Sequence, residues 1–165
     1  MTATFRPAET ADGARPAEAA GEAGAEAATG VTVRMVVHFD DLDAIGIVHN
    51  ARYPVLLERA MSQYWASHGV HFHDGRPSHP DGVIAVRELR LSYLAPMRGT
   101  GEVDVRFWAE RVGTTSATYG FAFVSTDGSV THADGHRVVV KIDPRTGRPK
   151  PWSNDFAHVL AELRA

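Results

Sequence analysis

Three carboxylates stand within four positions of the stretch HFDDLDAIGIVHNARYPVLLERA, residues 38–60. They are Asp40, Asp41 and Asp43, and apolar residues flank the group on both sides. Aspartates in such a cluster can shape a turn, bind a cation, or act on a substrate as a general base or nucleophile. The elements on either side of the cluster determine which of these uses is open to it.

A strand is predicted before the cluster and a long helix after it. Residues 31–39 are rich in β-branched side chains and partly alternate, as strands do. Asn50 is a suitable N-cap, and Pro54 is tolerated only in a first turn, so the helix is predicted to begin near residues 50–53. Gly69 fits the position just past its end. The helix has one apolar face, formed by Tyr53, Leu56, Leu57, Ala60, Met61, Tyr64 and Trp65.

Four more strand-like runs follow a polar loop at residues 70–82, and short turn-forming segments separate them. They cover residues 83–94, 101–111, 115–125 and 131–142. Ser153 is placed to cap a short last helix with Phe156, Val159, Leu160 and Leu163 on its apolar face. Consecutive strands joined by short turns form antiparallel sheets. The predicted class is α+β, with an antiparallel sheet of about five strands wrapped around one long central helix.

Composition restricts the classes of function. Residues 1–30 are rich in Ala, Glu, Gly and Pro and are predicted to be a disordered tail ahead of one domain at 31–165. Of the 17 bases and 20 acids, the tail holds two and five, so the domain carries 15 of each sign and a nucleic-acid partner is not expected. Cysteine is absent, which excludes disulfides and thiolate chemistry. With no apolar run near ~20 residues and no secretory signal, we expect a cytoplasmic protein without a membrane partner.

The residues after the first strand resemble a known family. The pattern D-x-D-x-x-G-I-V-x-N-x-x-Y is similar to the signature of hotdog-fold acyl-CoA thioesterases, and closest to the 4-hydroxybenzoyl-CoA thioesterase group. It is formed here by Asp41, Asp43, Gly46, Ile47, Val48, Asn50 and Tyr53, and the likeness extends over residues 31–152. The resemblance implies a hotdog fold and a homodimer whose sheets join edge to edge, with active sites at the interface and dimers pairing into a homotetramer. Coenzyme A would be part of the substrate, and no cofactor or metal is implied.

The resemblance places the catalytic carboxylate at Asp43 and the backbone N–H that polarises the thioester carbonyl at or near Asn50. A helix N-terminus offers free N–H groups and a partial positive charge, and one lost oxyanion donor typically costs about 2.7–4 kcal/mol of barrier. Asp43 either activates water or attacks the carbonyl itself, and both routes stay open. Asp40 is expected to be solvated and Asp41 to hold the turn.

Other residues are assigned around this centre. Gly46 allows a tight turn, and with Ile47, Val48 and Tyr53 it is expected to contact the substrate, although Tyr53 also fits the core. His49 either orients the substrate or packs at the dimer contact. At residue 45, an isoleucine replaces a smaller residue common in the family, and it is expected to reshape the acyl pocket.

Arg111, Thr115 and Ser116 occupy a hairpin that resembles the family's nucleotide-binding region, and arginine suits phosphate contacts. Arg137 and Lys141 are alternatives for the same role. Glu58 is the other candidate carboxylate, because a second branch of hotdog thioesterases carries its acid on the central helix. We expect it to pair with a base such as Arg52 or a neighbour's Arg59.

Several alternatives remain open from the residues alone. The loop at 68–79 holds His68, His71, His73 and His79, which favours a lid over the acyl pocket and, less strongly, a metal site. A hotdog dehydratase or hydratase acting on acyl thioesters is the second hypothesis. A non-catalytic dimer that binds acyl thioesters is the third. The thiol carrier is either coenzyme A or an acyl-carrier protein.

Overall fold

One five-stranded antiparallel sheet organises the computed structural model, which describes residues 30–164. Its strand order is β1 (Val31–Val37), β5 (Gly101–Val112), β6 (Ser116–Val124), β7 (Thr131–Lys141) and β4 (Ile84–Tyr93). Each predicted strand is present, with ends within two residues of the expected ones. The predicted disordered tail lies outside the described residues, except for Gly30.

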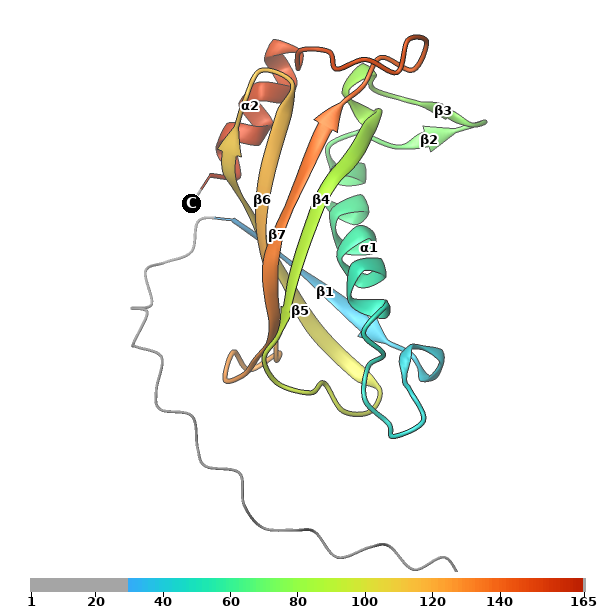
Figure 1. The fold of residues 1–165 in the computed structure, drawn as a ribbon, viewed down its shortest axis with the longest axis vertical. Coiled ribbons are helices and arrows are strands. Elements are labelled where there is room, and N and C mark those ends of the chain that lie inside the picture. The colour runs from blue at the N-terminus through green and yellow to red at the C-terminus, as the bar shows by residue number, and fades with distance from the viewer. Residues whose placement is uncertain (1–29, 165) are drawn as a thin grey trace, which may run out of the picture.

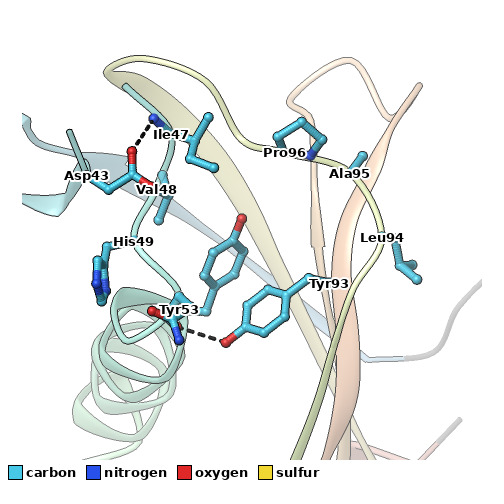
Figure 2. A pocket seen from close by; sticks show the side chains of 10 residues that line it. Asp43, Ile47, Val48, His49, Tyr53, Tyr93, Leu94, Ala95 and Pro96 are labelled. Carbon is cyan, nitrogen blue, oxygen red and sulfur yellow. Dashed lines mark hydrogen bonds between the residues drawn. The ribbon is translucent and has the colours of Figure 1, made fainter. Parts of the chain in front are cut away.

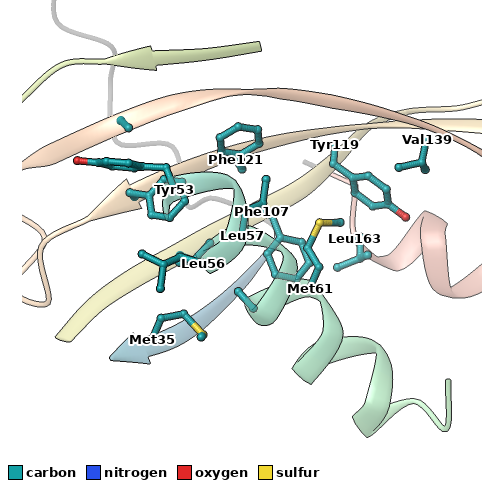
Figure 3. Packing of buried hydrophobic residues seen from close by; sticks show 14 of the residues in the cluster. Met35, Tyr53, Leu56, Leu57, Met61, Phe107, Tyr119, Phe121, Val139 and Leu163 are labelled. Carbon is teal, nitrogen blue, oxygen red and sulfur yellow. The ribbon is translucent and has the colours of Figure 1, made fainter. Parts of the chain in front are cut away.

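Helix α1 (Arg52–Ser67) packs on one face of this sheet (Figure 1). Its residues Leu56, Leu57 and Ala60 are at most 1% exposed and meet inward-facing side chains of β5 (Figure 3). Those side chains are Val103, Val105, Phe107 and Ala109, which alternate with outward-facing Asp104, Arg106 and Trp108. This alternation is typical of an antiparallel sheet that buries one face only.

Helix α2 (Asn154–Glu162) extends the same core. Ser153 caps it as predicted, because its Oγ accepts a hydrogen bond from the Phe156 amide at 3.3 Å. The Phe156 ring stacks on Trp65 of α1 with centroids 4.7 Å apart, and Leu160 and Leu163 are fully buried. Within residues 30–164, neither α-helix is long and apolar enough to cross a membrane.

Two local predictions were wrong. The segment 70–82 is not only loop, since it contains a hairpin of β2 (Phe72–His73) and β3 (Arg76–Pro77) and a 3-10 turn at Pro80–Gly82. Asn50 is not the N-cap of α1, because that position belongs to Ala51. No side chain of the described residues caps α1, and Nδ1 of His49 accepts the N–H of the N-cap residue Ala51 at 3.2 Å.

A buried ion pair links three distant segments. Asp81, in the 3-10 turn, is 1% exposed and accepts hydrogen bonds from Lys141 Nζ of β7 and from Ser153. The Ser153 Oγ bond is 2.6 Å and the Ser153 amide bond is 3.1 Å, so the cap of α2 is anchored to the same carboxylate. Lys141 is 3% exposed, and the alternative prediction that it contacts a phosphate was therefore wrong.

Strand β4 ends the sheet and carries large apolar side chains that are 39–53% exposed. They are Ile84, Val86, Leu89 and Tyr93. An edge strand with unpaired backbone groups and exposed apolar side chains is a template for pairing with another chain. Among the described strands, only β7 pairs with it.

Gly135 of β7 provides a test of strand spacing. It lies beside Leu91 of β4, and a Cβ there would clash with the backbone carbonyl of Arg90. We expect Gly135→Ala to force the β4–β7 ladder apart and to lower the free energy of unfolding by about 1–3 kcal/mol. Urea unfolding would measure the loss. Ala122→Ser on the neighbouring strand β6 is the control, and its free energy of unfolding should stay near that of wild type.

Candidate active site

The turn after β1 fixes the carboxylate of Asp43. The Asp43 amide donates to the Ile47 carbonyl at 2.8 Å, and the Gly46 amide donates to the Asp43 carbonyl at 3.1 Å. Gly46 has φ +76°, a left-handed conformation that glycine adopts without strain. Oδ1 of Asp43 accepts the amides of Ile45 and Ile47 at 2.9 and 3.2 Å. Oδ2 accepts no hydrogen bond from the described residues, so one oxygen is held and the other is available.

The two neighbouring aspartates have other tasks. Asp41 is 1% exposed, and its Oδ2 accepts the His38 amide at 2.8 Å. Its Oδ1 lies 3.5 Å from Nε of Arg52, and its carbonyl accepts the His49 amide. The Asp40 side chain is 73% exposed and lies 3.3 Å from Arg52 Nη2. The expected division is confirmed: Asp41 holds the turn and Asp40 is largely solvated.

A cavity of about 460 Å³ opens beside Asp43 at the start of α1 (Figure 2). Six predicted site residues line it: Asp43, Ile47, Val48, His49, Asn50 and Tyr53. Gly46 lies in the adjoining turn. The Asn50 amide donates to no other described residue, whereas the neighbouring amides of His49 and Ala51 are both engaged. Asp43 and Asn50 therefore line one cavity, and each has a polar atom, Oδ2 and the backbone N–H, that no other described residue engages.

Two tyrosines form the aromatic wall of this cavity. Tyr53 is 3% exposed, and its ring meets the edges of Tyr93 and Phe123 with centroids 5.2 and 5.1 Å away. Burial raises the pKa of Tyr53, which keeps its hydroxyl neutral. The Tyr93 hydroxyl donates to the Asn50 carbonyl at 3.0 Å (Figure 2). The end of β4 is thus tied to the start of α1.

Comparison with known proteins identifies the family of this chain. The family model of the Thioesterase-like superfamily matches residues 37–160. The chain belongs to this superfamily. The acyl-CoA thioester hydrolase YbgC of Escherichia coli O6:H1 is 25% identical over 114 residues, which cover 69% of this chain and 83% of that protein. The prediction of a hotdog-fold acyl-CoA thioesterase is confirmed at the level of family.

Solved structures agree with the assignment. A thioesterase from Thermus thermophilus, solved in complex with coenzyme A and Zn, is 26% identical, with a TM-score of 0.67 over 84% of this chain and 97% of that one. A 1,4-dihydroxy-2-naphthoyl-CoA thioesterase from Synechocystis has a TM-score of 0.70 at 14% identity, over 80% and 96% of the two chains. At that identity the likeness concerns the fold alone.

The sequence did not predict one wall of the Asp43 cavity. Its second wall is formed by Tyr93, Leu94, Ala95 and Pro96, at the end of β4 and in the loop that follows. This loop contacts the Asp43 turn through the Val48 amide, which donates to the Met97 carbonyl at 2.9 Å. The turn-forming residues 95–97 indicate that a loop follows the strand, but the sequence does not indicate which other loop it contacts.

Arg111, Thr115 and Ser116 lie away from the Asp43 cavity of the same chain. Ser116 pairs with Val140, and Val140 pairs with Ala85 at the start of β4. The cavity instead lies at the end of β4, beside Tyr93. The hairpin is therefore at the opposite end of the sheet, and its role toward a nucleotide stays a prediction.

The histidine-rich segment does not line the Asp43 cavity. His68 contacts the Tyr64 carbonyl, the side chains of His73 and Asp74 are 84% and 88% exposed, and His79 accepts the Asp81 amide. Among residues 30–164, no group of three or more His, Cys, Asp or Glu side chains could hold a metal ion.

Glu58 and Arg137 pair with each other, which corrects the expected partner of Glu58. The Glu58 carboxylate lies 2.6 Å from Arg137 Nη2, so its partner is neither Arg52 nor Arg59. The Arg137 side chain is 6% exposed, and its strand β7 lies between β6 and β4. Leu56, Leu57 and Met61 belong to the core and do not line the Asp43 cavity, and Ile45 is 74% exposed.

Proposed function

We propose that this thioesterase-family chain hydrolyses an acyl-CoA thioester to a free acid and a thiol, with Asp43 as the essential carboxylate. The observation that carries the proposal is that Asp43 and Asn50 line one cavity, while Oδ2 of Asp43 and the Asn50 amide have no partner among the described residues. The carboxylate either takes a proton from the attacking water or attacks the carbonyl carbon to form a mixed anhydride, which water then opens. In both routes the C–S bond breaks and the thiolate leaves.

The Asn50 amide would receive the oxyanion. As charge develops on the carbonyl oxygen, a fixed backbone donor at a helix N-terminus stabilises it without reorganisation. The Tyr93 hydroxyl bond to the Asn50 carbonyl keeps that peptide group in place. His49 has a positioning role, because its Nδ1 accepts the Ala51 amide and so helps to fix the first turn.

The substrate class follows from the relatives. The E. coli relative is named an acyl-CoA thioester hydrolase, and the Thermus structure holds coenzyme A. We therefore favour coenzyme A over an acyl-carrier protein as the thiol carrier. A panel of acyl-CoA thioesters, assayed for released thiol, tests the proposal, and the absence of release from every member would contradict it.

We also propose that two copies pair through β4 into a dimer. The exposed apolar side chains of this edge strand and its unpaired backbone favour that contact. Light scattering is expected to give at least twice the 17.9 kDa chain mass, and a concentration-independent monomer would contradict the pairing. Assembly of two dimers into a tetramer stays a prediction that the same measurement tests.

A further inference from the structure

A second cavity, of about 520 Å³, lies between the C-terminal half of α1 and the start of β4. Its wall is mostly apolar, with Trp65, Val70, Phe72, Ile84 and Val86 among the lining residues. Glu58 and Arg137 also line it. An apolar cavity with a cation in its wall suits a ligand with an apolar stem and an anionic end.

Arg137 has unused hydrogen-bonding capacity at this cavity. Its Nη2 meets Glu58 at 2.6 Å, and its Nη1 has a weak acceptor, the Met61 sulfur, at 3.5 Å. Its Nε is buried and donates to no described residue. Because buried donors are normally satisfied, the guanidinium lacks at least one acceptor. A ligand carboxylate that takes the place of Glu58 would bind this guanidinium strongly, since the planar fork of arginine matches two carboxylate oxygens.

The residue that now faces Arg137 can give way. The Glu58 side chain is 55% exposed and sits on the outer flank of α1, so it can turn into solvent. An entering carboxylate would then replace it on the guanidinium without leaving a buried charge unpaired. Such an exchange is favourable only for an anionic ligand, because Glu58 is a better partner for the Arg137 guanidinium than any neutral group.

The β4 dimer joins this cavity to the thioester site. In an antiparallel pair related by a two-fold axis, the start of one β4 lies beside the end of the other. The start of β4 lines the Arg137 cavity through Ile84 and Val86, and its end lines the Asp43 cavity through Tyr93. Each Asp43 cavity therefore adjoins the Arg137 cavity of the second copy.

We propose that the Arg137 cavity receives the distal end of the acyl group and selects acyl chains that end in a carboxylate. This inference rests on the proposed thioesterase function and on the β4 dimer. Arg137 acts as a specificity residue in it, and Glu58 is the internal competitor for its guanidinium.

Matched thioesters test this selection in the full chain. Adipoyl-CoA is compared with hexanoyl-CoA, and suberoyl-CoA with octanoyl-CoA, so that each pair differs in the terminal carboxylate. We expect kcat/KM to favour the carboxylate-ended member of at least one pair by about tenfold or more, mainly through KM. Equal hydrolysis within both pairs would overturn the inference while leaving the proposed function intact. Hydrolysis of no thioester in a wider panel would overturn both.

Three variants locate the preference. Arg137→Met is expected to bring the ratio within the preferred pair close to one, and Arg145→Met, at an exposed loop position, is expected to leave it unchanged. Glu58→Gln removes the competing carboxylate and should raise the ratio by about two- to fivefold. Glu58→Gln changes a half-exposed side chain and is expected to fold, so it tests the inference even if Arg137→Met does not fold. A ratio that Glu58→Gln does not raise, or that folded Arg137→Met retains, would overturn the inference.

Discussion

Asp43→Asn is expected to reduce kcat/KM for acyl-CoA hydrolysis by about 10²–10⁴-fold without loss of the folded chain. The amide oxygen of Asn can keep the Oδ1 position and accept the amides of Ile45 and Ile47, so the turn survives. The second position becomes an NH₂ group, which can neither take a proton from water nor attack a carbonyl. Release of thiol measures the effect, and the absence of cysteine from the chain removes the protein's own background.

Asp40→Asn is the matched control for this experiment. Asp40 belongs to the same acidic cluster, but it is largely solvated and lies outside the cavity. Its loss should change kcat/KM by no more than about twofold, as for a weak surface ion pair. Asp43→Ala should be as inactive as Asp43→Asn and less stable, because both turn bonds are lost. Near wild-type turnover by folded Asp43→Asn would refute the assignment.

The fold was predictable where local pattern decides it. The β-branched runs, the apolar stripe of α1 and the Ser153 cap each have a short-range physical cause, and all appear in the structure. The start of α1 falls at Arg52, within the expected range, but its N-cap is Ala51 and not Asn50. Hairpin β2–β3 was missed because its two-residue strands are too short to show a period.

The candidate site was predictable only on its contiguous side. Residues 43–53 bring together a turn, a carboxylate and a helix start within one stretch, and that stretch lines the cavity. The opposite wall comes from Tyr93 to Pro96, far along the chain, and only tertiary packing brings it there. The burial of Arg137 and Lys141 was missed for the same reason, since a basic residue on a strand gives no sign of a distant acidic partner.

Acid should weaken the fold through Asp81. Burial alone would raise its pKa, but the hydrogen bonds from Lys141 and Ser153 and the Lys141 charge hold the pKa of Asp81 below its usual value. The unfolded chain, with an aspartate pKa of about 3.9, then binds the proton more readily than the folded one. This contribution is complete above that value and is lost as the pH falls through the lower, folded pKa. Asp104, whose pKa is held low by its hydrogen bond from Arg34, adds a loss of the same sign.

Lys141→Met is expected to lower the free energy of unfolding by about 3–5 kcal/mol at neutral pH, because it leaves the Asp81 carboxylate buried without its cation. For a chain of this size the melting temperature should fall by about 6–20 °C. Lys150→Met, at an exposed position nearby, is the control, and its stability should stay near that of wild type.

The double variant Asp81→Asn/Lys141→Met should recover part of the loss in stability, since the unpaired charge is gone. Its acid sensitivity should also be weaker than that of wild type, because the Asp81 contribution is gone. A single Lys141→Met variant as stable as wild type would mean that the buried pair contributes nothing to the fold.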